Sequence, residues 1–483
     1  MSLSSALSIA QSALLATSKQ TSVVSRNVAD ASNPDYTRRI AVVTSTAPGA
    51  RAVEIQRAAN ELLFRQNLSA LSAWSGQSAL YNGMDQLELS VNGVDNASSP
   101  STAIAKLQQS LQLYATTPSN QNLGTSVIDA AKQVVNSLNS GTKAIQDFRT
   151  QADSQIATAV DDLNSLLGQF QDANKAVISG TRSGTDVSDA LDQRDALLKK
   201  ISEYVPVSTF TRGDNDMVVT TKDGTTLFET VPRSVTFAPS AGYSAGTPGN
   251  TVYIDNVPVS AGTGDNATAE GKLAGLLKLR DGVASTMQSQ LDEIARGLVT
   301  AFAETAPSQP NAAGLFTWSG APAIPAAGTL VDGLAGSIGV NAAFDPSAGG
   351  NPALLRDGGA NGAAYVVNTG NASYSDLLIS YGNKLDQPMA FDASAGIAVS
   401  SGVSDYAANA IGWFEGVRQQ ASTNADSKQA LAARTAEALS NDTGVNVDQE
   451  MSLLLDLEHT YQASAHMMKT VSDMLDALMS AVG

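Results

Sequence analysis

A serine flanked by glycines is the first residue whose setting could support covalent chemistry. The run Gly242-Tyr243-Ser244-Ala245-Gly246 matches G-x-S-x-G, the pattern of a nucleophile elbow. That motif needs a strand before the serine and a helix directly after it, because the sharp turn between them exposes the hydroxyl. Here Thr247-Pro248-Gly249-Asn250 follows, which cannot begin the required helix. We therefore interpret the segment as a flexible Gly/Ser loop and not as an esterase site.

Two carboxylates three positions apart form the second candidate. Asp192 and Asp195 flank Gln193 and Arg194, and paired carboxylates can act as general acid and general base. An arginine between two acids lowers their pKa values, which makes both carboxyls poor general acids. The pattern therefore favours a hydrogen-bonded junction between a helix and a strand.

Histidine and cysteine give no further chemistry. His459 and His466 are seven positions apart, outside the i, i+4 spacing of a helical zinc site, and no H-E-x-x-H pattern accompanies them. The sequence has no cysteine, which excludes disulfides, thiolate nucleophiles and Cys-ligated metals. No phosphate-binding G-x-x-x-x-G-K-[ST] loop occurs. We expect neither enzyme activity nor a metal or other cofactor.

Length and composition limit the class of protein. A chain of 483 residues is long enough for several domains, and with 43% hydrophobic but only 5% aromatic residues its cores must be aliphatic. The net charge of −17 would repel nucleic acid and anionic lipid. No run of about 18 apolar residues suggests membrane insertion. The first 18 residues contain no Lys or Arg, so we expect any export to proceed without a cleaved signal peptide.

Both ends of the chain carry apolar residues at alternating steps of four and three, the spacing of a heptad seam. The first seam predicts a helix of about 26 residues that stops at Asn33-Pro34, because proline disfavours helix in the residue before it. The last segment repeats the pattern, with Asp448 and Glu450 in its first turn, where carboxylates suit the helix dipole. Isolated helices of this length are marginal in water, so we expect the two to pair with each other or with neighbouring subunits. The seam positions are Leu3, Leu7, Leu14, Val24, Val28, Leu454, Leu457, Tyr461, Met468, Val471, Leu475 and Leu478.

Long helical periods follow the first seam. They predict helices from Arg51 to Val91, from Ile104 to Tyr114 and from Val127 to Val177, the last with Gly180 as its C-terminal cap. The third segment keeps four-three spacing with one stutter over about 50 residues. A helix of that length implies a rod-like bundle.

The middle of the chain changes period. Short β-rich runs between Val205 and Asp255, with a hairpin signal at Asp223-Gly224, predict a small β domain. Helical period returns from Leu273 to Phe302 and from Tyr406 to Leu439. The fold is thus predicted to be mainly α, with a terminal coiled coil, a helical-bundle stalk and a small β-rich outer domain inserted at the far end of the stalk. The expected domains are 1–45 with 446–483 (terminal assembly), 46–186 with 268–306 and 401–445 (stalk), 187–267 (β-rich), and 307–400, a Gly/Ala/Pro-rich region left unassigned.

Four separated segments resemble flagellar axial proteins. Asn27 to Arg39 is similar to the N-I-A-N-x-x-T-P-G-Y-T-R-Q run of rod, hook and hook-associated proteins, and Gly444 to Glu450 is similar to G-V-N-L-D-E-E. Leu191 to Leu197 and Gly271 to Asp281 resemble the L-D-Q-R-D-x-L and G-x-L-x-G-L-L-x-x-R-D segments of the family of the first hook-associated protein, FlgK. The matching positions are Asn27, Pro34, Tyr36, Thr37 and Arg38 in the turn, and Asp192, Gln193, Arg194, Asp195, Arg280 and Asp281 in the inner segments.

The resemblance implies a structural subunit of the bacterial flagellum that forms the junction between hook and filament and polymerises through its terminal helices. Another axial protein, such as hook, rod or the second junction component, is the alternative. Implied partners are copies of the chain in a ring, hook protein on one side, the second hook-associated junction protein on the other, and an export chaperone at the C-terminal helix. The implied location is extracellular, after type III export without a cleaved signal peptide.

Overall fold

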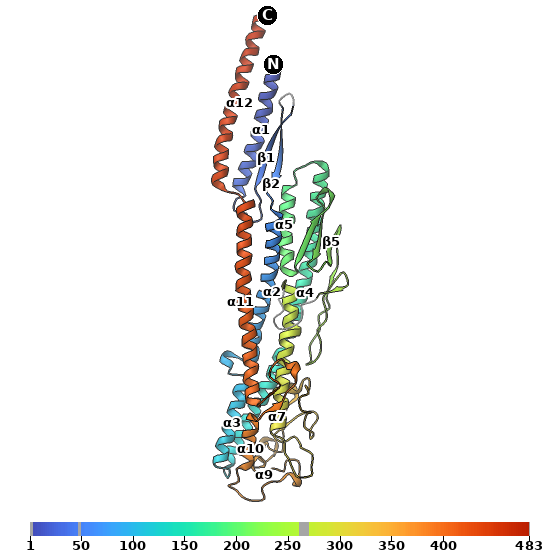
Figure 1. Cartoon of the computed structure of the whole chain (residues 1–483), viewed down its shortest axis with the longest axis vertical. Coiled ribbons are helices and arrows are strands. Elements are labelled where there is room, and N and C mark those ends of the chain that lie inside the picture. The colour runs from blue at the N-terminus through green and yellow to red at the C-terminus, as the bar shows by residue number, and fades with distance from the viewer. Residues whose placement is uncertain (1–2, 47–49, 260–269, 483) are drawn as a thin grey trace.

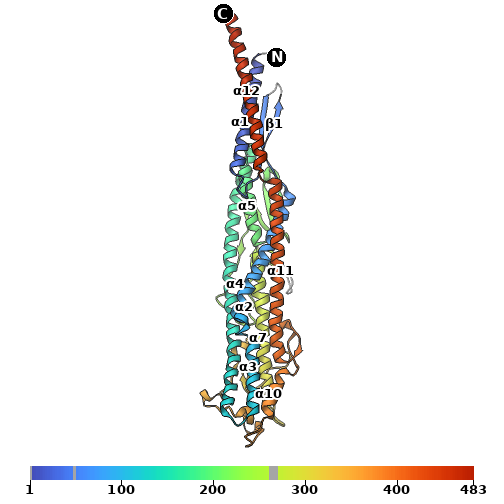
Figure 2. The same cartoon turned by 90° about the vertical axis from the view of Figure 1, so that its left-hand side faces the viewer.

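The computed structural model describes residues 3–46, 50–259 and 270–482. They form a long rod with both ends of the chain at the same tip, as Figure 1 shows. The view turned by 90° in Figure 2 shows the same narrow outline. The rod has two parts, a terminal unit at the tip that carries the chain ends and a helical stalk below it.

The terminal unit consists of α1 (Leu3–Ala29), α12 (Val447–Val482) and the hairpin of β1 (Arg39–Thr46) and β2 (Ala50–Arg57). Helices α1 and α12 run antiparallel and pack against each other, while the hairpin lies along α1 (Figure 1). The strands pair antiparallel, with Val43 opposite Val53. The helix predicted to begin at Arg51 begins instead at Glu61, because the β-branched run of β1 recruits residues 50–57 as its partner strand.

The stalk is built from α2 (Glu61–Val91), α4 (Gln121–Ser183), α7 (Ala284–Ala301) and α11 (Val403–Thr443). Shorter helices α3 (Pro100–Thr116), α5 (Ser188–Tyr204) and α6 (Lys272–Leu277) complete it, and a π-helical turn over Lys278–Val283 joins α6 to α7. One continuous aliphatic core runs through these helices. Helix α4 is longer than predicted, since its cap is Gly184 in the left-handed conformation and not Gly180.

The β region follows α5. A four-stranded sheet of order β3-β4-β5-β6 is made by Val207–Thr211, Met217–Thr221, Thr226–Glu229 and Val231–Pro232, and the Asp223-Gly224 turn joins β4 to β5 as predicted. A three-stranded sheet comprises β7 (Val235–Thr236), β8 (Tyr253–Ile254) and β9 (Val257–Pro258).

The β region does not lie at the far end of the stalk, contrary to the prediction. It lies beside the C-terminal half of α4, close to the terminal unit (Figure 1). Phe228 of β5 meets Phe170 of α4 edge to face, with ring centroids 5.0 Å apart. The apolar face of α4 therefore continues past the bundle and holds the sheet near the tip that carries the chain ends.

Residues 307–400 occupy the far end of the rod instead, around α3 and α10 (Figure 1). Their regular elements are short: β10 (Phe316–Thr317), α8 (Leu334–Ser337), β11 (Gly339–Val340), α9 (Leu354–Asp357), α10 (Asp376–Asp386), β12 (Met389–Ala390) and β13 (Ser400–Ser401). Short 3-10 turns lie in this region at Pro346–Ala348, Ala363–Tyr365 and Ala393–Ala395, and elsewhere in the chain at Val94–Asn96 and Gly213–Asn215.

Buried carboxylates on and just after α7 hold this irregular region in place. Asp292 accepts hydrogen bonds from the backbone N–H groups of Gly333 (2.9 Å) and Ala335 (2.8 Å), at the start of α8. Glu304 accepts the N–H groups of Ala360 and Asn361, each at 2.9 Å. Backbone donors of a segment with little ladder structure are thus satisfied by side chains of the stalk.

Candidate assembly site

The turn after α1 is closed by a buried hydrogen-bond network. The Tyr36 hydroxyl donates to Asn27 Oδ1 (2.8 Å), and the Arg39 N–H donates to the same oxygen at 3.0 Å. Asn27 Nδ2 in turn donates to the Arg39 carbonyl at 2.9 Å. Burial raises the pKa of Tyr36 to about 12, so its hydroxyl stays protonated as a donor. Asn27 therefore fixes the path of the chain from α1 into β1, while Pro34 lies exposed at the apex of the turn.

The start of α12 joins the same network. Asn446 caps α12 by accepting the N–H of Gln449 at 3.1 Å. Glu450, one turn later, points inward and accepts from Asn27 Nδ2 at 2.9 Å and from Arg38 Nε at 2.6 Å. The Arg38 N–H donates to the carbonyl of Thr443 at 2.8 Å, just before the break between α11 and α12. The two ends of the chain are thus joined through their family-motif residues.

A second group of charges lies on the stalk side of the turn. Asp192 of α5 accepts from Arg39 (2.5 Å), Arg57 (3.0 Å) and the Thr37 hydroxyl (2.5 Å). Asp195 accepts from Arg57 Nη2 at 2.6 Å. We call Arg38, Arg39, Arg57, Asp192, Asp195 and Glu450 the arginine–carboxylate cluster.

The arginine of the L-D-Q-R-D segment does not lie between its two acids, contrary to the prediction. Arg194 Nη1 donates to Asn174 Oδ1 (3.0 Å) and to the Asn215 carbonyl (2.7 Å), which ties α5 to α4 and to the turn before β4. Burial raises the pKa of Asp195, although Arg57 opposes the shift, so the predicted lowering is wrong for this carboxyl. Gln193 is exposed. The partners Arg39 and Arg57, which sequence interpretation missed, come from the hairpin.

The second inner segment clamps the loop that follows β7. Arg280, in the π-helical turn, pairs with Asp153 of α4 at 2.6 Å and with its neighbour Asp281 at 2.6 Å. Burial alone would lower the pKa of Arg280, but the hydrogen bonds to Asp281 and Asp153 outweigh it and raise the pKa. Asp153 also accepts the N–H of Ser240 (2.7 Å) and the Tyr243 hydroxyl (2.8 Å).

Gly275 of the same segment lets α6 cross α2 closely. A Cβ at this position would lie 2.6 Å from the backbone carbonyl oxygen of Gly76, which no larger residue could tolerate without a shift of the helix. The G-x-L-x-G-L-L spacing is therefore a packing requirement of the stalk.

The predicted seam residues lie mostly between α1 and α12. Val24 and Leu457 are buried, whereas Tyr461 and Leu478 are exposed. The half-buried positions are Leu7, Leu14, Val28, Leu454, Met468, Val471 and Leu475. The side chain of Leu3 lies outside the described residues. Small residues of the two helices are also buried, and these are Ala10, Ala13, Ala16, Thr17 and Ser464.

A second apolar stripe on α12 lies beside the face that packs on α1. Met467 and Met474, one heptad apart, are 57% and 54% exposed, and Leu453 continues their line. Met451, Leu455 and Met479 widen the exposed apolar surface. Several large apolar side chains exposed along one helix are typical of an interaction surface.

Catalytic candidates gain no support from the geometry. Ser244 lies in a loop, and its backbone carbonyl accepts a hydrogen bond from Arg149 Nη1 at 3.4 Å. Both histidines are exposed on α12 in the terminal unit. Over residues 3–46, 50–259 and 270–482, no group of three His, Cys, Asp or Glu is arranged to hold a metal ion. Within those same ranges, no helix is long and apolar enough to cross a membrane.

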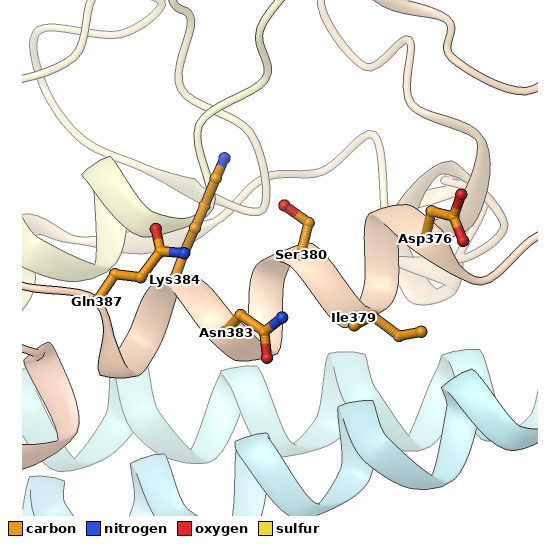
Figure 3. A pocket seen from close by; sticks show the side chains of 6 residues that line it. All are labelled: Asp376, Ile379, Ser380, Asn383, Lys384 and Gln387. Atoms are coloured by element: carbon orange, nitrogen blue, oxygen red, sulfur yellow. The ribbon is translucent and has the colours of Figure 1, made fainter.

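A shallow hollow of about 300 Å³ lies on α10, lined by Asp376, Ile379, Ser380, Asn383, Lys384 and Gln387. Figure 3 shows Lys384 and Ser380 pointing the same way from the helix. Burial lowers the pKa of Lys384, whose ammonium lies 5.6 Å from the centre of the Tyr381 ring. Asp376 and Lys384 are possible bases in its lining, but among the described residues neither is hydrogen-bonded to Ser380, so the hollow does not present a formed nucleophile–base pair.

Two family models match the chain. Residues 84–309 match the flagellar hook-associated protein FlgK helical domain, and residues 440–481 match the flagellar basal body rod FlgEFG protein C-terminal model. The first covers α3 to α7 and the β region, and the second covers α12.

Curated relatives carry one name. Flagellar hook-associated protein 1 of Bacillus subtilis (strain 168) is 22% identical over 527 residues, which cover 99% of this chain and 98% of that protein. The proteins of the same name from Salmonella typhimurium and Escherichia coli K12 are 22% and 21% identical over 313 residues, 62% of this chain and 56% of each relative. A solved structure of the flagellar hook junction protein FlgK from Burkholderia pseudomallei aligns with a TM-score of 0.43 and 20% identity, over 53% of this chain and 47% of that one.

Proposed function

We infer that this chain, which belongs to the family of flagellar hook-associated protein 1 (FlgK), is a structural subunit of the bacterial flagellum at the junction between hook and filament. The family model over the stalk and the relative that matches along nearly its whole length support this role above that of another axial protein. The rod C-terminal model over α12 fits a chain that shares its terminal unit with the wider group of axial proteins.

One observation carries the mode of assembly, namely that α12 leaves large apolar side chains exposed although it packs on α1. Leu457 and Ser464 are buried, whereas Met467 and Met474 beside them stay exposed. We propose that the exposed stripe is covered by the terminal units of neighbouring copies in a ring. At about 25 cal/mol per Å² of apolar area, burial of such a stripe repeated around a ring is a substantial driving force.

The finer assignments extend this proposal. Hook protein would contact the ring on one side and the second hook-associated protein on the other, and an export chaperone would cover the stripe on α12 before assembly. The chain would reach its extracellular position through the flagellar type III export apparatus. It would act as a building unit without catalysis, and Ser244 would be one residue of the loop that Arg149 and Asp153 hold.

Deletion of the gene tests the role. Negative-stain electron microscopy of the deletion strain should show hooks without filaments, and a plasmid copy should restore filaments. Cells that lack hooks altogether would place the chain in the hook or rod and overturn the junction role. Replacing Ser244→Ala in the plasmid copy should leave swimming unchanged, because the loop serine has no catalytic part to play.

A further inference from the structure

The hydrophobic core of the stalk stops before the terminal unit. Its buried members extend from Leu68 to Ala421 in sequence, and among the described residues none belongs to α1, the hairpin or α12. The terminal unit has a small buried set of its own, which includes Ala10, Ala16 and Leu457. Apolar burial therefore stabilises each part internally but does not fix one part against the other.

The covalent connections between the two parts are short and lack regular structure. Residues 58–60 lead from β2 into α2, and residues 444–446 lead from α11 into α12. In both views the rod changes direction where α11 ends and α12 begins (Figures 1 and 2). A groove of about 1230 Å³, lined by the turn, the start of α2, α5 and the end of α11, opens at the same level.

Polar contacts carry the orientation across this boundary. Asp192 of the stalk receives Arg39 at 2.5 Å, Arg57 at 3.0 Å and the backbone N–H of Thr37 at 3.2 Å, all from the terminal unit. An exposed ion pair, Arg26 with Asp189 at 2.5 Å, and a partly exposed one, Lys199 with Asp35 at 2.9 Å, flank it. Exposed pairs contribute little, whereas breaking a buried one is costly, so Asp192 is the main polar contact.

We propose that the terminal unit is a separately orientable body and that Asp192 is the positioning residue that sets its angle to the stalk. Hydrogen bonds to charged groups are directional, so four donors from three residues converging on one carboxylate favour a single orientation. If Asp192 lost its charge, Arg39 and Arg57 would lose their ion pairs with it. Tilting of the terminal unit would then let water solvate the two guanidinium groups. Such a tilt exposes none of the stalk core, so orientation is lost while both parts stay folded.

The use of an adjustable terminal unit, but not its existence, rests on the proposed function. Subunits of a ring between two different structures must present their terminal helices at a defined angle, yet accept different neighbours on the two sides. A polar boundary that the buried core of the stalk does not cross, among the described residues, permits that adjustment, because tilting requires no repacking of that core. The L-D-Q-R-D segment would then serve orientation through Asp192 and stalk folding through Arg194.

The absence of cysteine from the sequence makes the test clean, because two introduced thiols are the only ones to label. Ser22 on α1 and Ser165 on α4 are both exposed. The full-length chain with Ser22→Cys and Ser165→Cys, spin-labelled, should give one narrow distance distribution by pulsed electron resonance. Adding Asp192→Asn should at least double its width, while the calorimetric melting midpoint of the stalk moves by less than about 2 °C. Asp172→Asn, an exposed carboxylate of α4 outside the cluster, is the matched control and should change neither quantity.

Two results would overturn the proposal. An unchanged distribution in Asp192→Asn would mean that other contacts fix the angle, and loss of the cooperative melting transition in both Asp192→Asn and Arg57→Gln would mean that the cluster belongs to the fold of the stalk. If only Asp192→Asn fails to fold, a broadened distribution in folded Arg57→Gln supports the proposal and an unchanged one refutes it. These measurements use the free chain, so they stand apart from the microscopy that tests the junction role.

Discussion

Asn27 Nδ2 donates a buried hydrogen bond of 2.9 Å to Glu450 Oε2, across 423 positions of the sequence. The pair joins the last turn of α1 to the first turn of α12, with Asn27 wholly buried and Glu450 only 1% exposed. Because Glu450 also accepts a hydrogen bond from Arg38 Nε, one carboxylate links both ends of the chain to the turn between α1 and β1. The antiparallel register of the terminal helices is therefore specified by polar groups as well as by their apolar seam.

Replacing Asn27→Asp should open this end of the terminal unit. The new carboxylate would replace a donor with a buried negative charge beside Glu450, at a cost of about 3 kcal/mol. Hydrogen exchange followed by mass spectrometry should show faster exchange in the first turns of α12, with the stalk unaffected. Gln11→Glu, on an exposed face of α1, is the control and should leave exchange as in the unaltered chain. Equal protection in both variants would contradict a specifying role for Asn27.

Substitutions on the two faces of α12 should separate folding from assembly. Leu457→Ala, on the buried face, should lower the stability of the α1–α12 pair by about 2–4 kcal/mol. Met474→Lys, on the exposed face, should change the stability of the free chain by less than about 0.5 kcal/mol yet prevent filament growth in the complemented deletion strain. Normal filaments with Met474→Lys would show that the exposed stripe is not an interface.

Asp153→Asn should release the loop after β7. The Asp153–Arg280 pair is buried, and the substitution would weaken its bond to Arg280, which keeps Asp281 as a partner, so we expect stability to fall by about 1.5–3 kcal/mol. Limited proteolysis should reveal a new cleavage site within residues 240–250. Asp147→Asn removes an exposed partner of Lys143 on the same helix and should cost less than about 1 kcal/mol. A loop that remains resistant in Asp153→Asn would refute the clamp.

The stability of the far end should depend on pH through Asp292. Burial raises the pKa of Asp292 to about 6, although the hydrogen bonds from the backbone N–H groups of Ala335 and Gly333 partly oppose this shift. The folded state thus holds a proton on Asp292 between about pH 4 and pH 6 that the unfolded state releases. Its contribution is full below pH 4 and is lost as the pH rises through 6, by about 3 kcal/mol for a shift of roughly two pKa units.

Urea unfolding at several pH values checks this sign. The free energy of unfolding of the unaltered chain, relative to that of Asp292→Asn, should fall as the pH rises from 4 to 6 and then level off. Taking the difference removes the contributions of the other carboxyls. A difference independent of pH would mean that Asp292 titrates normally in the folded chain.

The sequence predicted the elements whose causes are local. Heptad spacing and the Asn33-Pro34 stop gave α1, and four-three spacing gave the long α4, since helix period is a property of neighbouring residues. The hairpin was missed although Arg39–Thr46 is rich in β-branched residues, because the apolar positions after Arg51 also fit a helical period. Pairing with β1 decided between the two.

The parts of the fold and of the site that the sequence did not predict depend on contacts between distant segments. The order of residues 307–400 follows from Asp292 and Glu304, acids on the stalk whose backbone partners no local pattern reveals. The place of the β region follows from the extra length of α4. At the candidate site, family motifs singled out Asn27, Arg38 and Asp192, but their mutual contacts arise only when the chain ends meet at α5.

The adjacency of the two chain ends also orders events in time. Helix α1 is synthesised before α12, and the face that it packs against α12 lacks that partner until α12 has been made, more than 400 residues later. A chain interrupted before Glu450 would keep Asn27 and Arg38 without their carboxylate. Only a chain extended through α12 can present the finished terminal unit, so products truncated before it would be left out of the growing structure without a separate proofreading factor.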